Sequence, residues 1–177
     1  MFIEPTSIDG LYTVDLDRHE DDRGFFARVW CVNELSDEGL TAGFVQASIS
    51  YNAKANTLRG LHYQTEPYGE TKLIRCEAGA VHDVILDLRP KSDTYLQWES
   101  FELTAKNGRQ LYVAAGLAHG FQTLDDNTVV GYNIDTFHQP GHATGVRWDD
   151  PAFGIEWPEA DELVMSDKDR SWPDFTP

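Results

Sequence analysis

Residues 72–88 read KLIRCEAGAVHDVILDL, and this stretch decides the fold class. Its two halves, Lys72–Glu77 and Val81–Leu88, are rich in residue types that favour β-strands. Ala78-Gly79 between them has the composition of a turn. The stretch therefore predicts two short strands separated by a turn.

The same pattern recurs at intervals of about ten residues along much of the chain, the rhythm of a sandwich or barrel. Further strand-like segments are Phe44–Ser50, Gln97–Thr104, Gln110–Val113 and Thr128–Thr136, with turn residues at Pro90–Asp93, Lys106–Gly108 and Leu124–Asn127. Helical periodicity is scarce, with short candidates at Val32–Leu40 and Glu159–Lys168. We therefore predict an all-β fold, a mainly antiparallel barrel with a short C-terminal helical cap, in which residues 1–177 form one domain. A closed barrel offers its mouth or lumen as a ligand site.

Composition narrows the class of protein. The chain has 177 residues, 41% of them hydrophobic, so it can bury a real core. Its formal charge of −16 predicts that it does not bind nucleic acid non-specifically. No apolar run approaches the roughly 20 residues of a membrane span, and the first ten residues lack a signal-peptide pattern. Cys31 and Cys76 show no metal-ligand spacing and are interpreted as reduced thiols of a cytoplasmic protein.

Polar side chains on the predicted strands indicate where a ligand could bind. In Phe44–Ser50, strand alternation places Gln46, Ser48 and Ser50 on one face. That face is either a solvated outer surface, the more common case, or a polar barrel lumen. The lumen is favoured here because the next segment contains Arg59 and His62.

The segment Arg59-Gly60-Leu61-His62 should alternate as well, with Arg59 and Leu61 on one face and Gly60 and His62 on the other. A lone strand histidine is more often structural than catalytic. Two other residues favour a functional role for His62: Lys72 opens the next predicted strand, and a second histidine, His119, follows Gly116.

Residues 108–119, GRQLYVAAGLAH, resemble the second sequence motif of the cupin barrels, with Ala114 in place of the usual proline. The first cupin motif supplies two histidines and a glutamate. Here His62 stands alone, and Lys72 occupies the place of the glutamate. A metal site needs a carboxylate at that place, so the lysine argues against a metal and indicates that an ammonium takes over part of its electrostatic role. The alternative is a surface lysine at the start of a strand.

Nearly the whole chain resembles the nucleotide-sugar epimerases of the cupin superfamily, the dTDP-4-dehydrorhamnose 3,5-epimerase family. The matching segments are Asp22–Phe26, Arg59–Gln64, Lys72–Arg75, Val84–Arg89, Gly116–Phe121, Tyr132, Trp148–Pro151, Gly154–Pro158 and Ser166–Asp169. The resemblance implies a double-stranded β-helix (jelly-roll) fold, a homodimer, and catalysis without metal or redox cofactor. It also implies a reaction in which a 4-keto group acidifies C3 and C5 of a 6-deoxyhexose or a related heptose, so that proton removal gives an enolate and reprotonation from the other face inverts the carbon.

The resemblance assigns four reacting groups. His62 is the base, Asp169 pairs with it and fixes its tautomer, and Lys72 stabilises the enolate oxygen. Tyr132 is the acid that returns a proton from the opposite face. Each has a plainer alternative: Tyr132 could be one aromatic residue of a barrel wall, and Asp169 a solvated loop charge.

The resemblance also assigns substrate contacts. Arg23, Arg59 and Lys168 match positions that hold the diphosphate or the nearby substrate, which suits guanidinium and ammonium groups. The other positions taken as substrate-binding are Phe26, Arg28, Gln46, Ser48, His119 and His138.

Some positions depart from the family pattern. Family members often carry Glu where Arg28 stands, Tyr where His138 stands, Glu at Ala143 and Lys at Asn133. These departures favour a base other than thymidine, and GDP-, CDP- and UDP-linked sugars stay open beside dTDP. Inversion at C3, C5 or both stays open too. Two other functions remain as alternatives: a cupin nucleotide-sugar 3,4-ketoisomerase and a non-catalytic sugar-nucleotide-binding barrel. A metal-dependent oxygenase is the least favoured.

Overall fold

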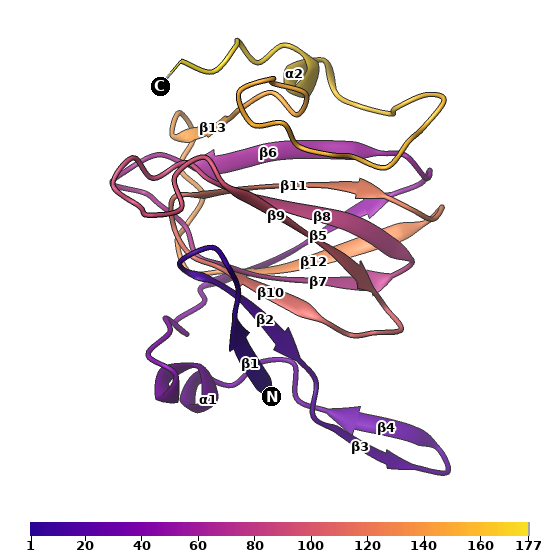
Figure 1. The fold of residues 1–177 in the computed structure, drawn as a ribbon. Coiled ribbons are helices and arrows are strands. Elements are labelled where there is room, and N and C mark those ends of the chain that lie inside the picture. Colours follow the sequence, from indigo (N-terminus) through magenta and orange to yellow (C-terminus); the bar gives the residue numbers. More distant parts are fainter. Residues whose placement is uncertain (177) are drawn as a thin grey trace.

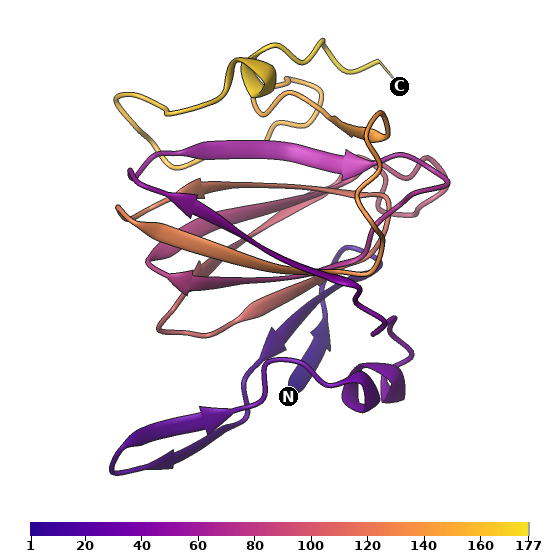
Figure 2. The ribbon, with the colours of Figure 1, turned by 180° about the vertical axis from the view of Figure 1, so that it is seen from behind.

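The computed structural model describes residues 1–176, which form two facing antiparallel sheets, a projecting hairpin and two short helices (Figures 1 and 2). The first sheet has the order β1(Phe2–Pro5), β2(Leu11–Asp15), β10(Gln110–Val113), β7(Lys72–Ala78), β12(Thr128–Ile134), β5(Gln46–Asn52). The second has the order β13(Ala143–Gly145), β6(Leu58–Gln64), β11(Leu117–Thr123), β8(Ala80–Asp87), β9(Trp98–Thr104). The hairpin pairs β3(Arg18–Asp21) with β4(Gly24–Ala27), and the helices are α1(Val32–Asp37) and α2(Asp167–Arg170).

The predicted all-β barrel with a C-terminal cap is confirmed. Each predicted strand is present with ends shifted by no more than a few residues; β10 has the predicted bounds and β7 runs one residue further. The N-terminal strands β1 to β4, the fully buried strand β11 and the short strand β13 were not predicted. The side chains that face inward from the two sheets form the main core, including Ile74, Ile85 and Phe121.

Both helix predictions were too long. The first candidate, Val32–Leu40, is helical only over α1, because Gly39 takes a positive φ of 73° and Leu40 N–H closes the end by donating to the Leu35 carbonyl. The second, Glu159–Lys168, is wrong over most of its length. Val164 instead forms a parallel bridge with Thr57, and its backbone bonds go to the segment that leads into β6, so only the end of the candidate enters α2.

The two outer faces of the barrel are covered by different parts of the chain. Behind the second sheet lies the C-terminal segment with α2 (yellow in Figure 1), over an apolar cluster that includes Leu61, Val84 and Phe153. Behind the first sheet, Leu35 of α1 packs with Val14 and Leu73. The cap therefore sits directly over β6, the strand that carries His62.

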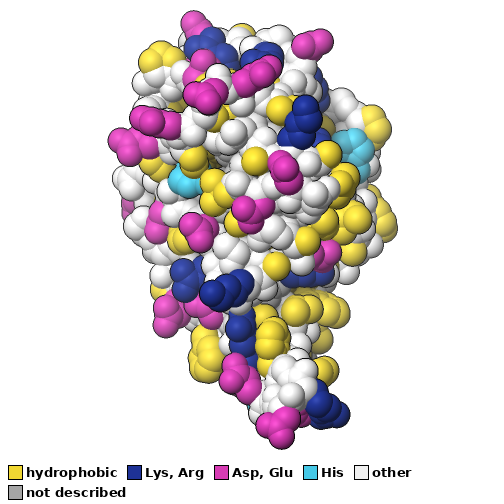
Figure 3. Space-filling view, turned by 90° about the vertical axis from the view of Figure 1, so that its right-hand side faces the viewer, with side chains coloured by type: hydrophobic (Ala, Val, Ile, Leu, Met, Phe, Trp, Pro, Cys, Tyr) yellow, Lys and Arg dark blue, Asp and Glu magenta, His cyan; other side chains and the backbone are white. Residues whose placement is uncertain are grey.

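The hairpin β3–β4 extends away from the barrel (Figures 1 and 2). Phe25 and Phe26 on it are 52% and 75% exposed, an unusual state for large apolar side chains. Figure 3 shows hydrophobic side chains beside cations on this projecting part of the molecule.

The edge strand β5 has the reverse of the usual surface pattern. Gln46 and Ser48 face a cavity inside the barrel, so the predicted polar lumen is confirmed for these two residues. The opposite face is apolar and exposed, with Ile49 at 68% and Tyr51 at 56%.

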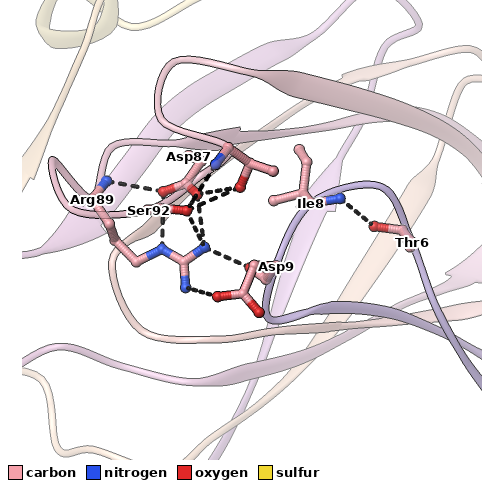
Figure 4. A network of polar contacts seen from close by, with 7 residues as sticks. Thr6, Ile8, Asp9, Asp87, Arg89 and Ser92 are labelled. Atoms are coloured by element: carbon pink, nitrogen blue, oxygen red, sulfur yellow. Dashed lines mark hydrogen bonds and ion pairs between the residues drawn. The ribbon is translucent and has the colours of Figure 1, made fainter.

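A buried polar network fixes the turns at one end of the barrel (Figure 4). Asp87 is fully buried and accepts hydrogen bonds from the Arg89 guanidinium at 2.7 and 2.9 Å, Ser92 Oγ at 2.6 Å and Thr94 Oγ1 at 2.7 Å. Arg89 also donates to the Asp9 carbonyl at 2.5 Å, which ties the 87–94 loop to the turn before β2.

Candidate active site

Strand register brings the predicted residues together from both sheets. His62 on β6 pairs with His119 on β11, and Lys72 on β7 pairs with Ile134 on β12. Between the sheets lies a cavity of about 310 Å³, lined by Gln46, Ser48, His62, Glu70, Lys72, His119, Tyr132, Ile134 and His138. The predicted base, cation and acid thus share one cavity, with His62 on one sheet and Lys72 and Tyr132 on the other.

A second cavity, of about 350 Å³, adjoins the first. It contains Arg59, Lys168 and Asp169, and it shares His62, Glu70 and His138 with the lumen cavity. Two predicted diphosphate-binding cations therefore lie beside His62, on the side where the cap covers β6.

The predicted face assignment around His62 was wrong for Arg59. Leu61 is fully buried under the cap, whereas Arg59 is exposed and lines the same cavity as His62. The cause is an irregular register: Arg59 and His62 on β6 oppose Phe121 and His119 on β11, so β6 has one extra residue. Such a bulge resets the alternation and re-aims a side chain. Arg59 is held in place by a 2.8 Å bond from its Nε to Asn52 Oδ1.

His62 is paired with Asp169 as predicted. Its Nε2 lies 2.6 Å from Asp169 Oδ1, and the Asp169 side chain is only 6% exposed. Burial alone would raise the pKa of Asp169, but hydrogen bonds from His62, Ser166 and the Gly60 backbone, with the charge of His62, hold that pKa below its ordinary value. A carboxylate at Nε2 leaves Nδ1 as the nitrogen that can accept a proton.

Asp169 is positioned by a short capped helix. The Ser166 side chain accepts from the Asp169 backbone N–H at 3.1 Å, the usual N-cap bond. Lys168 lies with its Nζ 5.2 Å from the centre of the Trp172 ring, and the Trp172 indole packs closely over Gly145.

Lys72 is buried, with 9% of its side chain exposed, and its Nζ is 2.8 Å from Glu70 Oε1. The predicted alternative of a surface lysine is therefore wrong. Burial requires a partner for the ammonium, and Glu70 supplies it.

Tyr132 lies on the sheet opposite His62 and lines the same cavity. Burial, with a smaller effect from the charge of Asp83, raises the pKa of Tyr132 far above its ordinary value. The phenol is therefore a neutral proton donor at any physiological pH. Its ring packs edge-on against His119, with centroids 5.9 Å apart, and His119 Nε2 lies 2.8 Å from buried Asp83 Oδ2.

Three predicted substrate-binding residues lie away from this cavity. Arg23 and Phe26 are on the projecting hairpin, and the Arg23 side chain is 89% exposed and paired with Asp21. Arg28 follows the hairpin and pairs with Glu34 of α1. Within one chain, therefore, none of the three is part of the wall around His62.

Two residues near the cavity were missed by sequence analysis. Glu70 lies two residues before Lys72, so strand alternation could have placed both on one face. Asp83 is a carboxylate inside the apolar run 81–88, which is a signal of a buried polar pair.

Over residues 1–176, no three His, Cys, Asp or Glu side chains cluster as metal ligands do. In the same residues, no helix is long and apolar enough to cross a membrane.

Known proteins share both the sequence and the fold of this chain. The family model described as dTDP-4-dehydrorhamnose 3,5-epimerase matches residues 5–176. A protein of that name from Sinorhizobium fredii is 42% identical over 98% of this chain and 89% of its own length. A crystal structure of the Bacillus anthracis enzyme of that name, with TDP and pyrophosphate bound, superposes with a TM-score of 0.94 at 41% identity, covering 98% of this chain and 99% of that one.

A more distant structure is ChmJ, a 3′-monoepimerase from Streptomyces bikiniensis in complex with dTDP-quinovose. Its TM-score is 0.90 at 30% identity, covering 97% of this chain and 86% of that one. The chain therefore belongs to the dTDP-4-dehydrorhamnose 3,5-epimerase family, isomerases that act on nucleotide sugars.

Proposed function

We propose that the protein inverts C3, C5 or both of a nucleoside-diphosphate 4-keto-6-deoxyhexose, or of a related 4-keto heptose, through an enolate. The observation that carries this proposal is the convergence of three groups on one cavity: the His62–Asp169 pair, the buried Lys72 ammonium, and the neutral Tyr132 phenol on the opposite sheet. They are the base, the oxyanion stabiliser and the acid that an epimerisation needs.

The reaction follows from these positions. Nδ1 of His62 removes the proton next to the keto group, and the electron pair of the broken C–H bond moves onto the keto oxygen. Asp169 stabilises the imidazolium that results, and Lys72 stabilises the enolate oxygen. The Tyr132 hydroxyl then gives its proton to the carbon from the opposite face. Exchange with solvent restores His62 and Tyr132, so no cofactor is consumed.

The diphosphate binds beside the base. Arg59 and Lys168 line the adjoining cavity, where a guanidinium and an ammonium suit phosphate oxygens. Gln46, Ser48 and His119 line the lumen, and in this proposal they contact the sugar. His138 lines both cavities, and we assign it to the nucleotide.

The protein forms a homodimer in which each hairpin completes the neighbour's site. Exposed Phe25 and Phe26, and the exposed apolar face of β5 with Ile49 and Tyr51, are surfaces that association would bury. In the dimer, Arg23, Phe26 and Arg28 reach the nucleotide bound by the partner. Sedimentation or light scattering should give twice the mass of the chain. Phe26→Asp should weaken nucleotide binding while the His62–Asp169 pair stays intact.

The substrate is a deoxysugar nucleotide, as it is for the relatives named above. The enzyme serves deoxysugar biosynthesis for a surface polysaccharide or a natural product, and it works in the cytoplasm, which agrees with the free thiols of Cys31 and Cys76. Because Arg28 is remote from its own chain's cavity, its departure from the family pattern bears on the partner's nucleotide subsite. A thermal-shift panel of dTDP, GDP, CDP and UDP identifies the base, since a ligand that binds only the folded state raises the unfolding temperature.

Incubation of a 4-keto nucleotide sugar in deuterated water tests the function. Deuterium should appear at C3, C5 or both, and His62→Ala should abolish the exchange. Absence of label with the dTDP, GDP, CDP and UDP sugars alike would refute the proposal. A product whose carbonyl has moved from C4 to C3, seen by NMR, would identify a ketoisomerase instead.

A further inference from the structure

Glu70 is a carboxylate in a place where a negative charge is unfavourable. Among the nine residues that line the lumen cavity in the described chain, it is the only acidic one. The proposed reaction brings an anionic substrate to this cavity and develops further negative charge on the keto oxygen. A carboxylate facing that charge raises the energy of the enolate unless it is engaged by a cation.

The engaged cation is Lys72. Glu70 Oε1 lies 2.8 Å from Lys72 Nζ, and the two side chains are only 13% and 9% exposed. Over residues 1–176, Lys72 has no second ion-pair partner. Glu70 is therefore the carboxylate that neutralises the ammonium, and the N–H donors that Glu70 does not contact are left for the cavity that Lys72 lines.

The backbone that carries Glu70 is fixed independently of this pair. Thr71 N–H donates to Asp135 Oδ1 at 2.7 Å, and Asp135 N–H donates to the Thr71 carbonyl at 3.1 Å. The Thr136 hydroxyl donates to the Gly69 carbonyl at 3.0 Å. The residues on both sides of Glu70 are thus tied to the segment that follows β12, so the backbone from which its side chain projects is held in place before substrate binds.

We propose that Glu70 is a positioning residue for Lys72. Its carboxylate holds the ammonium from one side through the ion pair and thereby keeps a free N–H directed at the keto oxygen on which the enolate charge develops. A four-carbon lysine stem is flexible, and an oxyanion stabiliser acts only when it is oriented in advance. This inference rests on the proposed epimerase function.

The variants that test it are Glu70→Ala, Glu70→Gln, Lys72→Ala and the double variant Glu70→Ala/Lys72→Ala. Glu77→Ala is the matched control, because Glu77 pairs with Arg75 two residues away on the same strand, at 2.5 Å, outside the cavity. Each variant is assayed with the 4-keto nucleotide sugar that the wild type accepts, for deuterium exchange, kcat and KM. Unfolding temperature and binding of the nucleoside diphosphate that the thermal-shift panel identifies check that the fold is retained.

Glu70→Ala should lower kcat by about ten- to a hundredfold and change KM by less than about threefold. The loss in kcat should be smaller than the loss caused by deleting the oxyanion donor itself. Glu70→Gln, which keeps an oxygen acceptor for the ammonium, should recover most of that loss. In the Lys72→Ala background, adding Glu70→Ala should cost less than about twofold, because the group through which Glu70 acts is gone. Glu77→Ala should match wild type.

Three results would overturn the assignment: an unchanged kcat for Glu70→Ala, an equal loss with and without Lys72, or no recovery by Glu70→Gln. An equal loss in both backgrounds would mean that Glu70 contacts the sugar directly. If the Lys72→Ala rate is too low to measure, the recovery by Glu70→Gln decides. The two proposals fail in different ways. Absence of exchange by the wild-type protein would refute the proposed function. Exchange by the wild type that Glu70→Ala leaves unchanged would refute only the role of Glu70.

Discussion

Replacement of Asp87 by asparagine should destabilise the protein at neutral pH by an amount that disappears in acid. Burial alone would raise the pKa of this carboxyl, but hydrogen bonds from Arg89, Ser92, Thr94 and the Arg89 backbone N–H lower it from 3.8 to about 2. At about 1.4 kcal/mol for each pH unit, that difference is worth about 2 to 3 kcal/mol of folding free energy. For a chain of this length, the unfolding temperature at pH 7 should fall by roughly 5 to 10 °C.

The sign of the pH dependence follows from the direction of the shift. Because the pKa is lower in the folded state, the stabilisation is fully present above pH 3.8 and is lost as the pH falls through about 2. The gap between wild type and Asp87→Asn, measured by urea unfolding, should be constant between pH 8 and about pH 5 and should narrow below about pH 4.

Asp21 provides the matched control. It has the same Asp-x-Arg arrangement with Arg23, whose backbone N–H donates to Asp21 Oδ1 at 2.8 Å, but both side chains are exposed. Asp21→Asn should leave the unfolding temperature unchanged. The reasoning would be refuted if wild type and Asp87→Asn differed in unfolding free energy by less than about 0.5 kcal/mol, or by an amount that does not change with pH. Either result would show that the stability given by the buried network does not depend on the charge of Asp87.

Three further predictions concern the site. Asp169→Asn should lower kcat by about 10² to 10⁴, because it removes the charge that stabilises the His62 imidazolium and sets its tautomer. Asp167→Asn, on the same helix, is the control and should change kcat by less than about twofold. Steady-state kinetics that show a loss below tenfold for Asp169→Asn would contradict this prediction. Tyr132→Phe should retain deuterium exchange but slow inversion by about a hundredfold or more at one carbon at least, which NMR of the product detects; equal loss of exchange and inversion would argue against its role as acid. Trp172→Ala should raise KM by about two- to fivefold through the loss of the ring that orients Lys168, and Trp172→Phe should restore it; an unchanged KM would mean that Lys168 is positioned without the ring.

The strands were predictable because their hydrophobic pattern reflects a local requirement. In β7, alternate side chains such as Ile74 and Cys76 enter the core, so the strand signal is present within a few residues. The same rule gave the lumen face of Gln46 and Ser48. The two strands of the hairpin carried no comparable signal, since β3 and β4 are almost wholly exposed and their apolar residues face solvent in one chain.

Features that depend on distant parts of the chain were not predictable from the local pattern. The bulge that turns Arg59 toward His62 arises from pairing with β11, about 60 residues away, and period-2 alternation assigns the residue to the wrong face. Residues 159–166 satisfy a helical pattern, but Val164 is extended instead. Its backbone N–H and carbonyl bond to Asn56 and Leu58 at the start of β6, and these bonds replace those of a helix.

The side chains of the site differ in how firmly the surrounding fold holds them. His62, His119, Lys72 and Tyr132 lie on interior strands whose register would have to change for them to move. Asp169 lies on a four-residue helix in the C-terminal segment, held by the Ser166 cap, the bond to His62 and the packing of Trp172 over Gly145. A helix this short has little stability of its own. Damage to its anchors should therefore remove the partner of the base before it affects the barrel, so activity should be lost at temperatures or denaturant concentrations where the two sheets are still folded.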